Sequence, residues 1–416
     1  MTTAGADHGT EHGTEQRARA RRARVAVALL FFGNGFVFAN VVPRYPEIKS
    51  DLGLSNAALG TAIAAMPFGA LVLGLLASPL ITRFGSARTA VSTLSLLGLT
   101  VLFVGTAPGY APLCAAIFLA GALDAITDVA MNAHGLRVQR RYGRSILNAF
   151  HGVWSVGAVL GGVTGAGAAQ AGLPLAAHLG VTGALTLALS LGCLPHLLPG
   201  AEDAERETPA DATASGRGTR RPAWHAMLAL GVLGLLSAAA AVAEDSGASW
   251  GSVYLRNELS AGPFVGGLAF TALQGAQTVG RLLGDRVVQR LGDRRTAQAG
   301  GLLVFLGMGA ALLWPSTAST IAGFGLCGLG IATLIPAAFH AADELPGLWP
   351  GAGITVTAFL MRVGFLVSPP VVGLIADAHS IRLGLLVVPL AGLLVLAASP
   401  SLSPAPAGRQ NQPAPA

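Results

Sequence analysis

Two carboxylates in an apolar stretch of the sequence have a spacing suited to chemistry inside a membrane. Asp124 and Asp128 are four residues apart, so they share one face of a helix, and Asn132 continues that face. A charged side chain at the centre of a membrane helix costs about 2.5–3.5 kcal/mol, and such residues are functional by default. A carboxylate removed from water binds a proton more readily, and a second carboxylate nearby adds to the effect. We therefore expect Asp124 and Asp128 to couple to protons; the alternative is a structural polar seam.

A second polar stripe follows in the next apolar stretch. Asn148, His151 and Ser155 are spaced i, i+3 and i+7, which places them on one helix face. A short basic loop joins the two stretches, so His151 and Asp128 should lie at similar depth and form a hydrogen-bonded pair. Histidine titrates near neutral pH, as a role in proton coupling requires. A packing histidine near the membrane interface is the alternative.

Amides and one arginine supply groups that could bind a solute. The amides are Asn34, Asn132, Gln274 and Gln277. Arg362 lies in the middle of an apolar stretch, where a guanidinium needs a partner. That partner is expected to be Asp124 or a carboxylate or phosphate of the solute, because guanidinium binds such anions through two parallel hydrogen bonds. A static ion pair is the alternative reading of Arg362.

One further carboxylate lies near the end of the seventh apolar stretch. Glu244 is expected to take part in proton coupling, although the membrane cost that argues for function fades near the headgroups. Trp250 and Tyr254 follow Glu244 in the sequence. A role near the outer mouth of the solute path and a place in an interfacial aromatic belt are equally good interpretations of these two residues.

Basic loops contain residues expected to hold a gate. These residues are Arg83, Arg88, Arg281, Asp285 and Arg290. Asp285 follows Arg281 by four positions, which is the spacing of a salt bridge along one helix face.

The elements that must position these side chains are membrane-spanning helices. Apolar residues make up 52% of the 416 residues and charged residues only 11%, and the mean hydropathy is +0.61. Twelve apolar stretches have the length that crosses a hydrocarbon core of about 30 Å. They cover residues 25–46, 57–80, 88–107, 111–134, 146–170, 175–198, 223–246, 262–284, 297–315, 319–341, 351–377 and 382–400. Backbone polar groups must be satisfied within lipid, so the sequence predicts an all-α membrane protein.

The distribution of positive charge predicts the orientation of the chain. Of the 26 Lys and Arg residues, 21 fall on the side of the two termini, four on the opposite side and one, Arg362, in the middle of a stretch. Positive residues collect on the cytoplasmic side, so both termini are expected in the cytoplasm of a multi-pass plasma (bacterial inner) membrane protein. The net charge of +6 is therefore no sign of nucleic-acid binding.

An internal repeat divides the chain into two halves. At an offset of 207 residues, Arg83–Ala90 aligns with Arg290–Ala297, both carrying the pattern Arg-x-Gly-x-x-Arg-Thr-Ala. Two parallel six-helix repeats imply a pseudo-two-fold axis along the membrane normal and a solute path between the halves. The expected parts are a basic tail (1–24), an N-terminal bundle (25–198), a linker (199–222), a C-terminal bundle (223–400) and a second tail (401–416).

These features resemble the major facilitator superfamily. The basic loops of the repeat carry the resemblance, and further segments are similar to its fucose-permease-like branch of uncharacterised bacterial inner-membrane members. Those segments are Asp128–Asn132, Phe150–Ser155, Glu244–Arg256, Gly280–Arg286 and Gly364–Gly373. The resemblance implies the major facilitator fold, alternating access and a monomer. The sequence departs from the family pattern at Thr82 and Ser249, where relatives often have Asp, and its first stretch has no carboxylate.

The function expected from these observations is secondary active transport of a small polar solute, such as a sugar or metabolite, driven by protons. Proton-antiport efflux of amphiphilic compounds is one alternative, and a non-transporting membrane sensor is another. The only lysine, Lys49, follows Ile48, so the chain has no Walker A motif. The three cysteines are far apart in sequence, so neither a metal nor any other cofactor is expected. No nucleophile–base arrangement indicates an enzyme.

Overall fold

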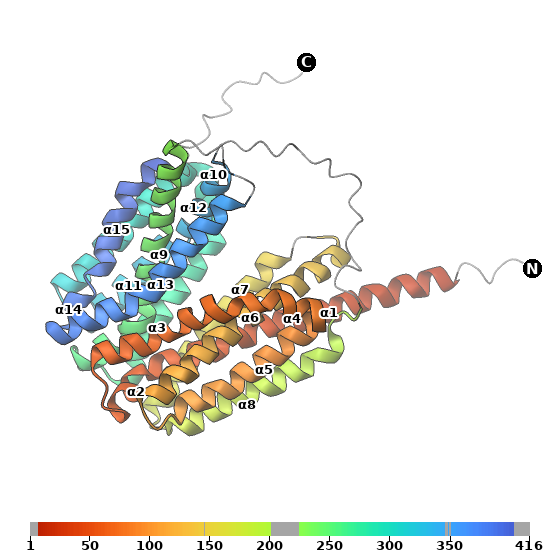
Figure 1. Ribbon diagram of the computed structural model, residues 1–416, viewed down its shortest axis with the longest axis horizontal. Coiled ribbons are helices and arrows are strands. Elements are labelled where there is room, and N and C mark those ends of the chain that lie inside the picture. The colour runs from red at the N-terminus through yellow and green to blue at the C-terminus, as the bar shows by residue number, and fades with distance from the viewer. Residues whose placement is uncertain (1–6, 145, 201–223, 346–347, 349–350, 403–416) are drawn as a thin grey trace, which may run out of the picture. The chain divides into compact units, whose positions relative to one another are not determined.

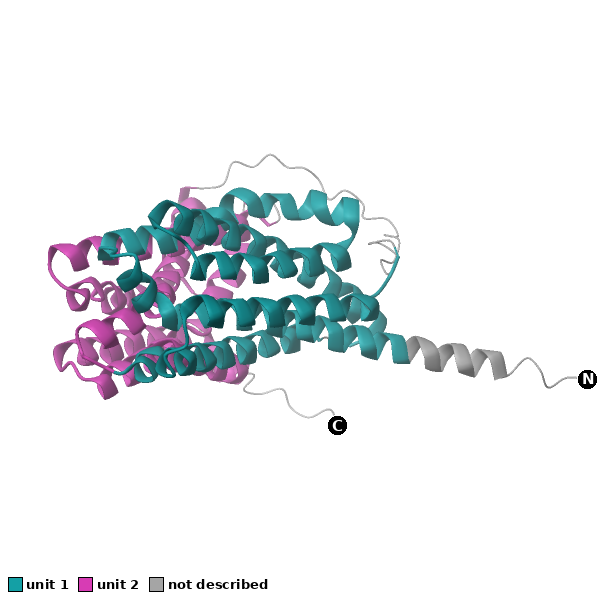
Figure 2. Ribbon diagram, turned by 90° about the horizontal axis from the view of Figure 1, so that it is seen from below, with its two compact units in different colours: residues 1–217, 262–267 teal, residues 218–261, 268–416 magenta. Residues whose placement is uncertain are grey.

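The computed structural model describes residues 7–144, 146–200, 224–345, 348 and 351–402, and every regular element in them is a helix (Figure 1). The chain forms two compact units (Figure 2). The first unit comprises residues 1–217 and 262–267, and the second comprises residues 218–261 and 268–416.

The first unit is built from helices that follow the apolar stretches of the N-terminal half. They are α1 (Asp7–Val41), η1 (Val42–Arg44), α2 (Tyr45–Asp51), α3 (Asn56–Leu73), η2 (Gly74–Leu76), α4 (Ala77–Phe84), α5 (Ser86–Gly105), α6 (Tyr110–Tyr142), α7 (Leu147–Gln170), α8 (Leu175–Cys193) and η3 (Leu194–His196). Its core is made largely by α1 against α7, α3 against α6, and α5 against α6 and α8.

The second unit follows the C-terminal half. Its elements are α9 (Trp224–Asn257), α10 (Pro263–Leu313, from Leu268 onward), α11 (Thr317–Ile331), α12 (Leu334–Asp343), α13 (Ala352–Ala378), α14 (Ile381–Gly384), α15 (Val387–Ala398) and η4 (Ser399–Ser401). Within this unit α9 packs most extensively against α13 and also against α11, α12 and α15.

Eleven helical stretches of the described residues are long and apolar enough to cross a membrane. One of them, α10, has 51 residues and contains a non-helical position at Gly292 (φ 80°, ψ 162°). It therefore contains two of the predicted stretches, and each of the twelve predicted stretches is largely helical. The sequence places a loop of about a dozen residues at this point. The structure instead makes the turn at Gly292 and continues the helices through the basic residues on both sides.

The predicted repeat is present in the local geometry of both units. Gly85 separates α4 from α5 with φ 85° and ψ 152°, nearly the conformation of Gly292, which lies 207 positions later. This backbone region is almost exclusive to glycine. At the same offset, a Cβ atom on Gly121 would collide with the Met66 carbonyl, and one on Gly328 would collide with the Leu273 carbonyl. The two units therefore share a corner and a close helix contact at equivalent positions.

Proline has different effects in different helices. Pro43 lies in the 3₁₀ turn η1, and a two-residue break at Ala332–Thr333 precedes Pro336 and separates α11 from α12. By contrast, α3 continues through Pro67 and α13 continues through the Pro369–Pro370 pair. Proline interrupts the helical hydrogen-bond ladder, but of these four sites only Pro43 and Pro336 lie at or near a break between helices.

We predict that Gly85→Ala and Gly292→Ala each destabilise the protein, because alanine is strained at this backbone conformation. The expected loss is about 1–3 kcal/mol for each substitution. It is measured as a lower midpoint of thermal unfolding of the purified protein in detergent. The control is Gly109→Ala, because Gly109 is extended (φ 173°) and has open space around its Cα. Equal midpoints for Gly85→Ala and Gly109→Ala would contradict the assigned role of the corner.

Candidate functional site

A stripe of glycines on α7 brings this helix unusually close to α1. A Cβ atom on any of three glycines would collide with a backbone carbonyl of α1. The contacts join Gly157 to Phe32, Gly161 to Phe36 and Gly165 to Asn40. Small residues spaced by four positions allow membrane helices to approach closely. Polar side chains on the two helices can therefore meet directly.

Asn34 of α1 joins three helices through its amide. Its Nδ2 donates to Oδ1 of Asp124 on α6 at 2.7 Å, and its Oδ1 accepts from Nε1 of Trp154 on α7 at 2.8 Å. The indole nitrogen can only donate, so Trp154 orients the amide and leaves its NH₂ group facing Asp124. Asn34 is 3% exposed, so this chain of hydrogen bonds lies inside the first unit.

The contact with Asn34 suits Asp124 in both protonation states. Oδ1 accepts a hydrogen bond from an amide, which a carboxylate and a neutral carboxylic acid can both do. Oδ2 is then the oxygen available to bind a proton. Asp124 is partly buried, and Asp128 interacts with it electrostatically. The side chain is therefore held in place while its charge is free to change.

Asp128, Asn132 and His151 form a second polar group on α6 and α7. Asn132 Nδ2 donates to Asp128 Oδ1 at 2.9 Å, and Asn132 Oδ1 lies 3.2 Å from His151 Nε2. An amide oxygen can only accept, so His151 Nε2 carries the hydrogen in this contact. The His151 ring also packs edge-on against Phe31, with centroids 5.1 Å apart. Asn132 thus contacts both Asp128 and His151, and the direct Asp128–His151 pair stays a prediction.

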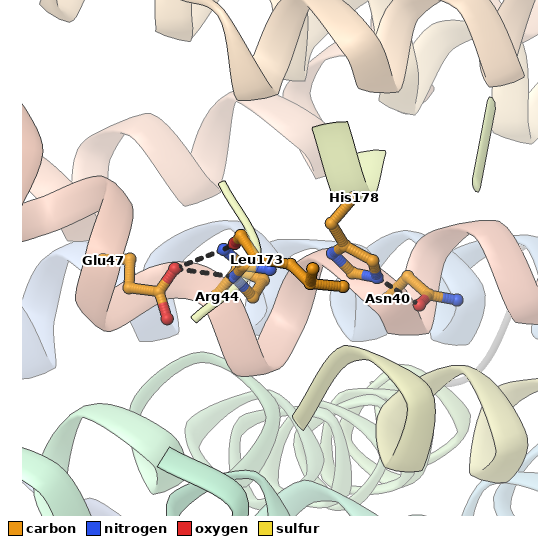
Figure 3. Close-up of polar contacts among 5 residues, drawn as sticks. All are labelled: Asn40, Arg44, Glu47, Leu173 and His178. Carbon is orange, nitrogen blue, oxygen red and sulfur yellow. Dashed lines mark hydrogen bonds and ion pairs between the residues drawn. The ribbon is translucent and has the colours of Figure 1, made fainter. Parts of the chain in front are cut away.

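A third polar group, which sequence reasoning missed, centres on Arg44 (Figure 3). Arg44 lies near the end of the first predicted stretch (25–46), and its side chain is 1% exposed. Its Nε donates to Glu47 Oε2 and its Nη2 to the Leu173 carbonyl, both at 2.7 Å. Nη1 is buried and has no hydrogen-bond partner among the described residues. The available signal was the Arg44-x-x-Glu47 spacing, which joins two charges on one helical turn.

His178 and Asn40 extend the Arg44 group along α1 (Figure 3). Asn40 Oδ1 lies 3.0 Å from His178 Nε2 on α8 and accepts from Thr164 Oγ1 on α7, also at 3.0 Å. Asn40 Nδ2 donates to the Phe36 carbonyl. Asn40 therefore links α1 to α7 and α8, whereas Asn34, earlier in the same helix, links it to α6 and α7.

The second unit buries amides where the sequence predicts solute-binding groups. Gln274 and Gln277 of α10 are 3% and 1% exposed. Gln274 Nε2 and Gln277 Oε1 have no hydrogen-bond partner among the described residues. Such buried atoms call for a ligand, a water molecule or a rearrangement. Arg362 of α13 is exposed and has no hydrogen bond or ion pair within the described parts of the chain. It lies in a different unit from Asp124, and their pairing stays a prediction.

The end of α9 differs from the predicted arrangement. Trp250 and Tyr254 are each 0% exposed, so the interpretation of these two rings as part of an interfacial aromatic belt is wrong. Glu244 and its neighbour Asp245 are partly buried. Ser249 donates to Asp245 Oδ1 at 3.0 Å. Asp245, which the sequence analysis did not select, is thus the carboxylate with a defined hydrogen-bond donor on this turn.

The predicted gating residues are exposed. Arg83 lies over the Phe84 ring, 5.4 Å from its centroid, and Arg88 and Arg290 are also exposed. Arg281 and Asp285 are both exposed, and they form no ion pair within the described residues, contrary to the expected salt bridge. An exposed pair gains little Coulomb energy and loses side-chain freedom, which explains the difference.

Comparison with known proteins is consistent with this geometry. The family model described as the Major Facilitator Superfamily matches residues 27–345. Membrane protein MosC of Rhizobium meliloti is 31% identical over 375 residues, covering 90% of this chain and 88% of MosC. An uncharacterised MFS-type transporter of Yersinia pestis is 30% identical over 386 residues, covering 90% and 94%. The crystal structure of the nucleoside transporter NupG superposes with a TM-score of 0.72 at 12% identity, covering 91% of this chain and 98% of NupG.

We predict that Glu47→Leu destabilises the protein by about 3 kcal/mol, because it leaves the Arg44 guanidinium buried without its carboxylate. The double variant Arg44→Met/Glu47→Leu should recover part of this loss, since the unpaired charge is then gone. Both are measured by thermal unfolding in detergent, with Lys49→Met as a charge-removing control on α2. A double variant less stable than Glu47→Leu would show that Arg44 stabilises through other contacts.

Proposed function

The chain belongs to the major facilitator superfamily, and we propose that it is a proton-coupled secondary transporter that moves a small polar solute by alternating access. The family and the fold are those of membrane transporters rather than enzymes. Proton coupling and the class of solute are the parts that we add. We also propose that the protein acts as a monomer in the bacterial inner membrane. Its charge distribution favours an orientation with both termini in the cytoplasm.

The observation that carries the proposal is the hydrogen-bonded chain from Trp154 through Asn34 to Asp124. It holds a titratable group within a predicted membrane span without a described basic partner, so that a proton can neutralise it. A neutral carboxylic acid costs much less in a low-dielectric environment than a carboxylate. Proton binding at Asp124 can therefore favour the conformational change that carries the solute across, and proton release can reset the site.

The second polar group, on α6 and α7, supports the proposal that the solute is polar. Asp128 and His151 are exposed within predicted membrane spans, and Asn132 between them is partly exposed. Ionisable groups at such positions generally face a water-filled path rather than lipid. Together they offer carboxylate, amide and imidazole groups that can form hydrogen bonds with hydroxyl or amino groups of a solute. Efflux of amphiphiles would favour an apolar, aromatic wall. This face of α6 instead carries Asp128 and Asn132.

Groups in the second unit are also proposed to take part in transport. Gln274 and Gln277 have buried amide atoms without described partners, which a solute can satisfy. Arg362 is proposed to bind an anionic group of the solute or to approach Asp124. Glu244 is proposed to assist proton transfer. A role in gating is proposed for the exposed charged residues Arg83, Arg88, Arg281, Asp285 and Arg290.

We predict that Asp124→Asn abolishes proton-driven accumulation of the solute but leaves exchange of solute across the membrane. Asparagine cannot bind the transported proton, yet it retains an acceptor oxygen for Asn34. The test uses purified protein in liposomes, with a pH jump for accumulation and labelled solute for exchange. Asp51→Asn, at an exposed carboxylate, is the control. Retention of proton-driven accumulation by Asp124→Asn would remove Asp124 from the coupling mechanism.

The class of solute is tested by a thermal-shift screen of the purified protein against sugars, other polar metabolites and amphiphilic antimicrobials. We predict stabilisation by a polar compound. With that compound, Asn132→Ala should raise KM about tenfold, the effect of losing one hydrogen bond to a polar partner. Stabilisation and flux only with amphiphiles would support efflux instead. Failure to move any stabilising compound across liposomes would favour a membrane sensor.

A further inference from the structure

A groove on the first unit is separate from all the polar groups described above. It lies between the start of α1 and the end of α8 and has a volume of about 600 Å³. Each helix lines it with the same spacing, i, i+1, i+4, i+5 and i+8: residues 21, 22, 25, 26 and 29 from α1, and residues 188, 189, 192, 193 and 196 from α8 and η3. This spacing follows one face of a helix over about 12 Å.

The chemistry of the groove changes along its length. Arg21, Arg22 and His196 lie at one end. The remainder is apolar and includes Leu29 and Leu189. The two helices thus contribute their basic residues at the same end of the groove. A groove with this polarity matches a molecule that has an anionic head and a hydrocarbon tail.

The two arginines at the basic end are available to a ligand. Arg21 and Arg22 are exposed, and neither has a hydrogen bond or ion pair with any described residue. Arg24, one turn farther along, is different. It donates to the Tyr142 hydroxyl at 2.9 Å and lies over the Tyr142 ring, 5.0 Å from its centroid. Arg24 therefore has a structural partner, whereas Arg21 and Arg22 have none among the residues that the structure describes.

The floor of the groove is open at one glycine. A Cβ atom on Gly192 would meet no atom within 4 Å, and the residue is exposed. By contrast, a Cβ atom on Gly33 would lie 2.7 Å from Leu189 Cδ2. Leu189 thus lines the groove and also packs beside the residue that precedes Asn34. The apolar part of the groove therefore borders the part of α1 that carries Asn34.

We propose that this groove binds an anionic glycerophospholipid of the surrounding membrane. Its phosphate group pairs with Arg21 and Arg22, for which guanidinium geometry is suited. One acyl chain lies along the apolar part, between Val25 and Leu29 of α1 and across Gly192 of α8. Charge complementarity at one end and continuous apolar surface at the other select a lipid over a free phosphate, which would leave the apolar part empty. Basic pockets between membrane helices are suited to anionic headgroups.

The headgroup part is tested with the purified full-length protein in neutral detergent. Dioleoyl phosphatidylglycerol should raise the unfolding midpoint by several degrees, and dioleoyl phosphatidylcholine, which has the same chains but no net charge, should have little effect. Arg21→Gln/Arg22→Gln should lose the difference between the two lipids. Arg140→Gln/Arg144→Gln, which removes two exposed arginines outside the groove, should keep it. Native mass spectrometry counts the bound lipid in each case.

The chain-binding part is tested by filling the groove. Gly192→Phe should abolish the bound phosphatidylglycerol while leaving both arginines in place. Gly231→Phe is the matched control, because Gly231 is also an exposed helical glycine with open space around it. Two results would overturn the proposal: equal stabilisation by the two lipids, or retention of phosphatidylglycerol by Gly192→Phe. Inorganic phosphate that stabilises as well as the lipid would show that the site binds the anion alone. None of these readouts depends on transport, so they are independent of the proposed function.

Discussion

Close packing of α1 against α7 decides where the polar groups of the first unit lie. Gly157, Gly161 and Gly165 leave no room for a Cβ atom between the two helices. Only at this separation can Trp154 reach Asn34 with a hydrogen bond of 2.8 Å. In lipid, association of helices depends on such contacts because the hydrophobic effect gives little preference for one helix over another. The glycine stripe therefore positions the candidate site as well as stabilising the unit.

The same helix pair carries two polar groups of different character. Asn34 presents an amide donor to a carboxyl group that can gain or lose a proton. Asn40 and Arg44 form a group in which Glu47 already neutralises the arginine. Buried polar groups are stable only when their partners are in place, so the second group fixes the end of α1. The group around Asn34 has a hydrogen-bond donor for one oxygen of Asp124 and leaves the other oxygen available to bind a proton.

The two units share backbone geometry but not chemistry. Gly85 and Gly292 make the same corner, and Gly121 and Gly328 make the same helix contact. At the repeat offset, however, Asp124 corresponds to Ile331, which is 2% exposed in the core of the second unit. A duplicated bundle can keep its packing positions while its functional side chains diverge, because packing and chemistry use different faces of each helix. Asp124 therefore has no carboxylate counterpart at the equivalent position of the second unit.

Much of the fold could be predicted from the sequence because lipid imposes a simple rule: each span must be apolar, helical and about 20 residues long. That rule and the repeat gave the twelve helices and placed Asp124, Asp128 and Asn132 on one face of α6. The partners of these residues depend on interhelical distance and on side-chain direction, which no spacing along one helix contains. Only the tertiary structure joined Asp124 to Asn34 and Trp154, bridged Asp128 to His151 through Asn132, and buried Arg44, Trp250 and Tyr254.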